Sequence, residues 1–152
     1  MNKKDMYILS QLRTDSRMRL TKMSRITRIP VSTLYDRIRL QQGKLIQKHT
    51  SIINFNKLGF NARAKIMLKV KQDQRELLRE YLLTHQNINS VYKINNGYDF
   101  LVEAVFRNLQ ELDYFIEALD EKFKIEQKDS YHIIDDIKRE GFLSDQKTVE
   151  LL

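Results

Sequence analysis

The sequence contains no cysteine and no tryptophan, and among its 152 residues only four are glycine and one is proline. Without cysteine, neither disulfides nor thiolate metal sites can form. The scarcity of glycine and proline, together with 41% hydrophobic residues, excludes a disordered or low-complexity chain. No apolar run approaches the roughly 18 residues of a membrane span, because Glu103 interrupts the longest stretch. The N-terminus also lacks an apolar signal core, so we expect a cytoplasmic protein with no membrane partner.

Acidic residues are scarce in the first third of the chain. Residues 1–55 hold 12 Lys and Arg against only Asp5, Asp15 and Asp36. Residues 56–152 hold 15 Lys and Arg against 17 Asp and Glu, so the formal excess of +7 resides in the first third. Positive charge concentrated on one small module neutralises phosphates, and this predicts double-stranded DNA as a partner.

Short amphipathic helices are expected in the same basic third. Apolar spacing predicts helices over residues 3–13 and 20–28, the second with Thr21 as its start signal. A third helix follows at once, capped by Ser32 and ended by Gly43. Three helices with a tight turn between the second and third are typical of a helix-turn-helix unit.

After the third helix, the spacing of apolar residues changes from the period of a helix to that of a strand. The β-branched run at residues 45–55 predicts a linking strand, which completes a DNA-binding domain at residues 1–55. We expect a hinge at residues 56–61, a second domain at 62–140 and a C-terminal tail at 141–152.

The second domain has the pattern βαββαβ, with a tight turn at Asn95-Asn96-Gly97. The predicted strands are residues 62–70, 88–94, 98–106 and 125–137, and the predicted helices are 74–84 and 109–123. The residues expected to point inward from the helices are Leu77, Leu78, Tyr81 and Leu82, then Leu109, Leu112, Phe115, Ile116 and Leu119. The fold class is therefore α+β, with an N-terminal winged helix-turn-helix domain and a C-terminal ferredoxin-like domain. Helices cover only one face of such a sheet, so we expect a second subunit on the other face and a homodimer.

The order and spacing of these features resemble the Lrp/AsnC (feast/famine) transcriptional regulators. The matching stretches are Asp5-Met-Tyr-Ile-Leu, Ile29-Pro-Val-Ser-Thr-Leu-Tyr-Asp-Arg-Ile38, Gly43-Lys-Leu-Ile46, Asn56-Lys-Leu-Gly59 and Asn96-Gly-Tyr-Asp-Phe100. The resemblance implies a sequence-specific DNA-binding regulator whose body domain oligomerises, as a dimer, tetramer or octamer, and binds an amino-acid effector. The sequence departs from the family at the turn, where Arg28 and Pro30 replace a small residue and a capping serine.

The third helix carries the candidate DNA-reading residues, because the N-terminal part of a recognition helix enters the major groove. The residues predicted to contact bases are Ser32, Thr33, Tyr35, Asp36, Arg37 and Arg39. The residues predicted to contact phosphates are Lys22, Arg25, Arg28 and Lys44. The alternative is a solvated charged surface on which Asp36 and Arg37 only form surface pairs.

The hairpin at residues 95–99 supplies the candidate effector site. By the resemblance, Asn96 and Gly97 line a pocket in which Tyr98 and Asp99 offer a hydroxyl and a carboxylate to an ammonium group. Ser130, on the last strand, is a further candidate by the same resemblance. The alternative is that Asn-Gly only provides the positive φ angles that a tight hairpin requires.

Catalytic motifs are lacking. His49, His85 and His132 lie in three separate predicted elements, without metal-ligand spacing, and no glycine-rich phosphate loop is present. We expect no enzyme activity, no metal and no cofactor. Two alternatives stay open: a non-specific architectural DNA-binding protein, and an enzyme related to the tetrapyrrole decarboxylases that share this fold.

Overall fold

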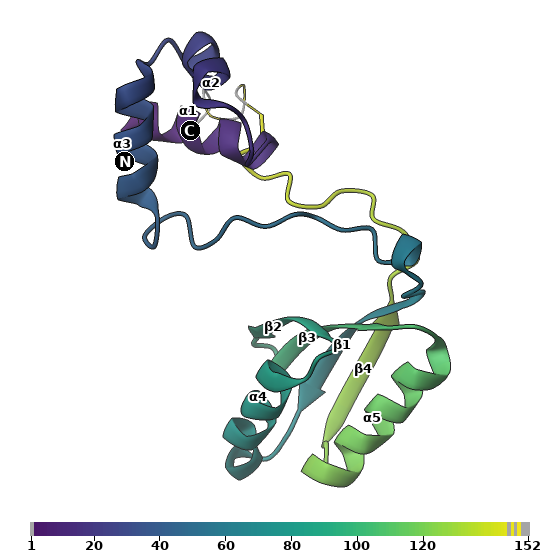
Figure 1. Ribbon diagram of the computed structural model, residues 1–152. Helices are drawn as coiled ribbons and strands as arrows, with labels where there is room; N and C mark the ends of the chain where they lie inside the picture. Colours follow the sequence, from purple (N-terminus) through teal and green to yellow (C-terminus); the bar gives the residue numbers. More distant parts are fainter. Residues whose placement is uncertain (1, 146, 148, 150–152) are drawn as a thin grey trace. The chain divides into compact units, whose positions relative to one another are not determined.

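The computed structural model describes residues 2–145, 147 and 149, and it divides into two compact units (Figure 1). Unit 1 comprises Met1–Ile52 together with Ile137–Leu152, and unit 2 comprises Ile53–Asp136. The chain therefore passes between the units twice. Of the predicted tail at 141–152, residues 146, 148 and 150–152 lie outside the described residues.

Unit 1 is built on three helices: α1 (Lys3–Thr14), α2 (Leu20–Thr27) and α3 (Val31–Gln41). Each contributes at least one buried apolar residue to a small core, formed by Ile8, Met23, Ile29 and Leu34. The three predicted helices are thus present, and α2 and α3 are separated by only three residues. This is the helix-turn-helix arrangement.

The start signals predicted for α2 and α3 are wrong. Arg19 precedes α2 and Pro30 precedes α3, and neither Thr21 nor Ser32 accepts a capping hydrogen bond. Both polar residues lie inside the first turn, because the capping positions, Arg19 and Pro30, come two residues before Thr21 and Ser32. The fixed backbone of Pro30 suits a position at the start of a helix, where no N–H is required.

The turn and the end of α3 match the sequence prediction. Arg28, at the position where the family has a small residue, adopts a left-handed conformation with φ of 57°. Gly43 follows the end of α3 with φ of 74°, as expected of a glycine just beyond a helix.

Unit 2 contains one antiparallel sheet with the strand order β2-β3-β1-β4. Its elements are η1 (Asn56–Leu58), β1 (Ala62–Lys69), η2 (Gln72–Gln74), α4 (Arg75–Thr84), β2 (Ile88–Lys93), β3 (Phe100–Phe106), α5 (Leu109–Phe123) and β4 (Gln127–His132). Figure 1 shows α4 and α5 together on one face of the sheet. The α+β prediction with a ferredoxin-like βαββαβ body is confirmed.

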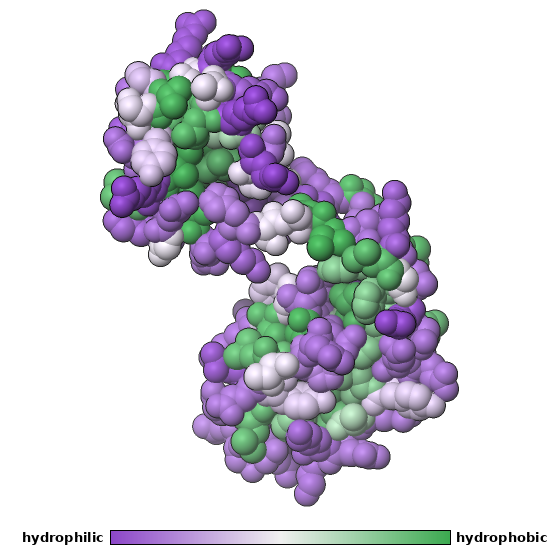
Figure 2. Space-filling view, viewed as in Figure 1, coloured by the Kyte–Doolittle hydropathy of each residue, from purple (hydrophilic) through white to green (hydrophobic). Residues whose placement is uncertain are grey.

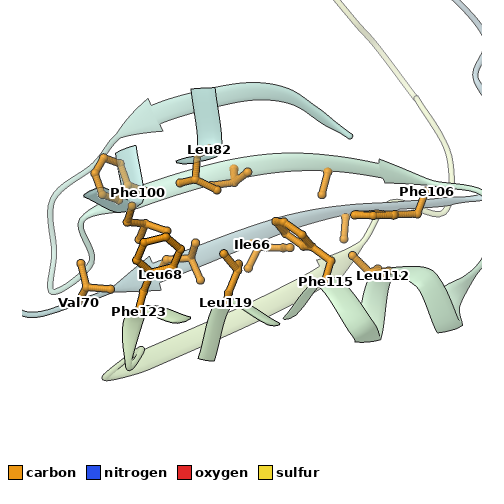
Figure 3. Packing of buried hydrophobic residues seen from close by; sticks show 14 of the residues in the cluster. Ile66, Leu68, Val70, Leu82, Phe100, Phe106, Leu112, Phe115, Leu119 and Phe123 are labelled. Atoms are coloured by element: carbon orange, nitrogen blue, oxygen red, sulfur yellow. The ribbon is translucent and has the colours of Figure 1, made fainter. Parts of the chain in front are cut away.

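The core of unit 2 lies between the sheet and the two helices. Alternate residues of β1, among them Ile66 and Leu68, are fully buried and meet Phe115 and Leu119 of α5 (Figure 3). The prediction that Leu77 and Leu109 point inward is wrong, since their side chains are 56% and 57% exposed. Leu77 is turned about 100° from the buried Leu78 around α4, and Leu109 is the first residue of α5.

Two strand predictions also require correction. Residues 45–55 form no strand: Ile46 makes only an isolated bridge to Gln42, and residues 47–54 are extended without a partner strand. High β-propensity alone does not make a strand, because a strand needs a neighbour to pair with. The last strand is shorter than predicted, since its pairing with β1 ends at His132, opposite Ala64, with one further hydrogen bond from the Ile133 N–H to the Arg63 carbonyl.

Candidate functional site

The outer face of α3 is free of core contacts. Leu34 is fully buried, whereas Ser32, Asp36 and Arg39 are exposed and recur at i, i+4 and i+7 on the opposite side of the helix. Tyr35, 55% exposed, lies beside this stripe. Tyr35 and Arg39 also border a hollow of about 270 Å³, whose remaining lining residues are Leu20, Ile38 and Gln42. The exposed stripe has the donors, acceptors and ring that base-edge recognition uses.

Arg37 has a different environment from the other predicted base-contacting residues. Its guanidinium donates to the Asp5 carboxylate at 2.7 Å, and the two side chains are only 30% and 13% exposed. The ion pair joins α3 to the first turn of α1. Thr33, the remaining candidate, is half-buried on the same flank of α3.

The four predicted phosphate-contacting residues, Lys22, Arg25, Arg28 and Lys44, are all exposed. Arg13 and Arg37 of unit 1 make ion pairs, whereas none of these four residues pairs with a carboxylate among the described residues. The residues that join unit 1 from the C-terminus carry equal numbers of basic and acidic side chains, so its excess of positive charge is kept. Figure 2 shows hydrophilic side chains over most of the visible surface of unit 1.

The hairpin between β2 and β3 has the geometry of the predicted tight turn. Asn96 and Gly97 both have positive φ, at 64° and 90°. The backbone N–H of Ile94 donates to the carbonyl of Asp99 at 3.1 Å and closes the hairpin. Positive φ at both central positions is what a two-residue turn of this hand requires.

Asp99 is held firmly by its own unit. One carboxylate oxygen accepts from the Val70 N–H at 2.9 Å, and the other lies 2.7 Å from Nε of Arg75. The side chain is only 13% exposed. The carboxylate therefore fixes the hairpin against the end of β1 and the start of α4.

Tyr98 reaches across the end of β1 to β4. Its hydroxyl donates to the Asp129 carboxylate and accepts from Nε2 of Gln127 at 2.7 Å. The hydrogen bond to Asp129, followed by desolvation and the charge of that carboxylate, raises the pKa of Tyr98 above its usual value. Ser130, by contrast, is exposed and pairs with Ile66 of β1, so it shares the side of the sheet on which Ile66 is buried.

The sheet face that carries no helix combines apolar and charged side chains. Glu103 is only 6% exposed and lies 2.8 Å from Nζ of Lys65 and 3.3 Å from Nε of Arg63. Arg63 also pairs with Asp136, and this hydrogen bond is the first cause that raises the pKa of Arg63. Nζ of Lys65 lies 5.6 Å from the centre of the Tyr92 ring.

Sequence analysis missed four of the polar residues that organise these sites. Asp5, Arg75, Gln127 and Asp129 each contact a predicted site residue from a distant part of the chain. A sheet register would have indicated Asp129, because it pairs with Met67 of β1, which on its other side pairs with Leu101 of β3. Charge alone could not single out Asp5 or Arg75 among so many surface residues.

No grouping suited to a metal ion occurs in the part of the chain that the structure describes. His49 lies in the extended segment after α3, His85 follows α4, and His132 ends β4. None of the described helices is both long enough and apolar enough to cross a bilayer.

The Lrp/AsnC ligand binding domain matches residues 63–142 of the chain. The HTH-type transcriptional regulator FL11 of Pyrococcus furiosus is 32% identical over 116 residues, which cover 76% of this chain and 77% of that protein. An uncharacterised HTH-type transcriptional regulator of the same organism is 28% identical over 139 residues, covering 91% and 93% of the two chains.

Solved structures share the fold. LrpC of B. subtilis superposes with a TM-score of 0.81 at 21% identity, covering 91% of this chain and 97% of that one. A transcriptional regulator of Neisseria meningitidis, determined as a complex with L-Met, superposes with a TM-score of 0.82 at 17% identity, covering 91% and 93%. The relatives are named as regulators, which indicates a non-enzymatic role. The chain is a member of the Lrp/AsnC family of HTH-type transcriptional regulators.

Proposed function

We propose that this regulator binds double-stranded DNA in the cytoplasm, in a sequence-specific manner, through unit 1. The observation that carries this proposal is the combination of an open outer face on α3 with exposed cations on α2, in the turn before α3 and in the loop after it. These cations make no ion pair among the described residues. Ser32, Thr33, Tyr35, Asp36, Arg37 and Arg39 are the proposed base-contacting residues. Lys22, Arg25, Arg28 and Lys44 are the proposed phosphate-contacting residues, which position the helix without reading sequence.

The partner on the open sheet face is a second copy of the chain. This face presents the half-buried Met67 and Leu101 together with Tyr92 and Tyr131, which are 51% and 58% exposed. Apolar and aromatic side chains of this kind are stabilised when another subunit covers them. A two-fold dimer presents two α3 helices to half-sites separated by about one helical turn or a multiple of it, and dimers assemble into tetramers or octamers.

The proposed effector is an amino acid, and the hairpin is the proposed site. Support comes from the complex of the Neisseria meningitidis relative with L-Met. Asn96 and Gly97 form the turn, while Tyr98 and Asp99 provide the hydroxyl and carboxylate. Ser130, the weaker candidate, lies on the opposite side of the sheet from Asp129, so it does not share the environment of the Tyr98 hydroxyl. Because Tyr98 already bonds to Asp129, a bound ammonium group would compete for, or join, that hydrogen bond.

Selection of bound sequences from a random DNA pool at two salt concentrations tests the proposal. We expect an enriched palindrome that survives the higher salt concentration, because base contacts add to the salt-sensitive phosphate contacts. Binding without enrichment would assign the architectural function instead, and absence of binding would refute the DNA proposal.

Two matched variants locate the interface. Arg25→Gln should weaken binding to all sequences and reduce the salt dependence by about one phosphate contact. Lys71→Gln, which removes an exposed cation from unit 2, should leave both quantities unchanged. Equal effects of the two variants would mean that overall charge, rather than unit 1, carries the binding.

A further inference from the structure

The C-terminal residues of the chain pack on α1 of unit 1. This C-terminal strap comprises the described residues 137–145, 147 and 149, all of which belong to unit 1. The guanidinium of Arg13 donates to the carbonyls of Glu140 and Phe142, each at 2.9 Å, and pairs with the Glu140 carboxylate at 3.1 Å. The Thr14 hydroxyl lies 2.6 Å from the carbonyl of Ser144.

The strap covers a side of α1 that the other helices do not. Ser10 lies about 200° around the helix from Ile8, which faces the core of unit 1. Ser10 is nevertheless fully buried, and it shares its side of α1 with Thr14, one turn later. Because Thr14 contacts Ser144, the strap is the part of unit 1 that lies over this side.

The local conformation of the strap depends on these contacts. Glu140 and Leu143 both have positive φ, at 51° and 59°, which is unfavourable for residues with a side chain. Within the strap, Ser144 stabilises this turn, since its N–H and hydroxyl both donate to the carbonyl of Gly141. Arg13 and Thr14 of α1 add three hydrogen bonds and one ion pair to this turn, and these contacts stabilise its conformation.

Four residues separate the strap from β4, the strand that contacts the proposed effector hairpin. Asp129 of β4 accepts from Tyr98, and Asp136, four residues after the end of β4, pairs with Arg63 of β1. Only residues 137–139 separate this anchor in unit 2 from the Glu140 anchor on α1. At the other crossing between the units, residues 47–54 form an extended segment with no partner strand.

We infer that the C-terminal strap is a regulatory connection, which links the hairpin-contacting strand β4 to α1 of the DNA-binding unit. This inference rests on the proposed function, because it assigns a route by which DNA binding by unit 1 is regulated. With the strap docked, two short segments of chain, residues 47–54 and 137–139, join unit 1 to unit 2, rather than one. Less conformational freedom is then lost when unit 1 binds DNA, so docking raises the affinity.

Three full-length variants test this inference. Thr14→Val removes the hydroxyl that contacts the strap without a change of charge, and Arg13→Gln removes the guanidinium contacts. Arg17→Gln is the matched control, because Arg17 is an exposed cation shortly after α1, and among the described residues its backbone N–H, not its guanidinium, makes a hydrogen bond, to Asp15. Each variant is combined with Ser144→Cys, which gives this cysteine-free chain a single thiol on the strap.

Two measurements are compared: the rate at which a maleimide labels the thiol, and the affinity for mixed-sequence double-stranded DNA. We expect labelling to accelerate about fivefold in Thr14→Val and about tenfold or more in Arg13→Gln, but not in Arg17→Gln. The affinity for DNA should fall about threefold or more in Thr14→Val. In Arg13→Gln it should fall further than in Arg17→Gln, which loses the same charge.

The outcomes separate the two proposals. Unchanged labelling in Thr14→Val and Arg13→Gln would refute docking of the strap. Faster labelling with unchanged DNA affinity would show that the strap is packing alone and would refute the regulatory connection. If the parent protein with Ser144→Cys bound no DNA while its thiol remained protected, the proposed function would fail and the docking would stand.

Discussion

The ion pair between Arg37 and Asp5 allows a structural role of Arg37 to be separated from base recognition. The two groups are 2.7 Å apart, and the side chains are 30% and 13% exposed. Exposed ion pairs contribute up to about 1 kcal/mol, and breaking buried ones costs about 3–5 kcal/mol. A pair of intermediate burial should therefore have a coupling free energy of about 1–2 kcal/mol. Because it joins α1 to α3, that energy should stabilise unit 1.

A double-mutant cycle with Asp5→Asn, Arg37→Met and the double variant measures the coupling. Hydrogen exchange of α3 is the readout, since it reports the opening of unit 1 rather than of the whole chain. About 1–2 kcal/mol corresponds to roughly a 5- to 30-fold increase in exchange for each single variant. Lys4→Met, which removes a neighbouring exposed cation of α1, should leave the exchange unchanged.

Selection of bound DNA sequences with the same variants tests whether Arg37 also recognises a base. If Arg37 only positions α3, Asp5→Asn and Arg37→Met should weaken binding alike, without altering the preferred bases. If Arg37 reads a base, Arg37→Met should relax the preference at one position, and Asp5→Asn should preserve it. A coupling below about 0.3 kcal/mol in the cycle would refute the reasoning from burial and distance.

Three further predictions concern packing, pH and backbone conformation. Leu78→Ala should lower the free energy of unfolding of unit 2 by about 2–5 kcal/mol in urea titrations, because this side chain is fully buried; a loss below about 1 kcal/mol would contradict its place in the core. Burial lowers the pKa of His85, which packs against Phe115 with ring centres 4.8 Å apart. Since the pKa of His85 is lower in the folded state, the unfolded state binds the proton more readily. The contribution of His85 to the free energy of unfolding should therefore be fully present above about pH 6.5 and be lost as the pH falls below it. His85→Gln should abolish this slope, and His132→Gln, at an exposed position, should retain it. Arg28→Gly should raise the stability of unit 1 by about 0.5–1 kcal/mol, because φ is 57°, while weakening DNA binding several-fold; stronger DNA binding would exclude a phosphate contact.

Local patterns predicted most of the secondary structure. The hairpin was readable because Asn96-Gly97 demands positive φ, and β1 because its apolar residues alternate. The linking strand at residues 45–55 failed, because its composition favours extended backbone but the chain alone offers it no partner. Ends of elements were harder to predict, as the early start of α3 after Pro30 shows.

The candidate sites were predictable only in part, because residue type indicates chemistry but not neighbours. The exposed stripe of α3 followed from helical spacing once Leu34 was assigned to the core. The contacts of Arg37 with Asp5, and of Tyr98 with Asp129, span about thirty residues and depend on packing between elements. No local pattern encodes such pairs.

Unit 1 is assembled from both ends of the chain, and this has a consequence for synthesis in the cell. The ribosome releases the three helices first and Ser144 only after all of unit 2 has been made. A chain cut short within unit 2 therefore lacks the strap that contacts Thr14, and the buried Ser10 on the same side of α1 loses its cover. Such fragments have an incomplete DNA-binding unit and are exposed to proteases. We therefore expect a truncated product to bind DNA more weakly than the complete chain.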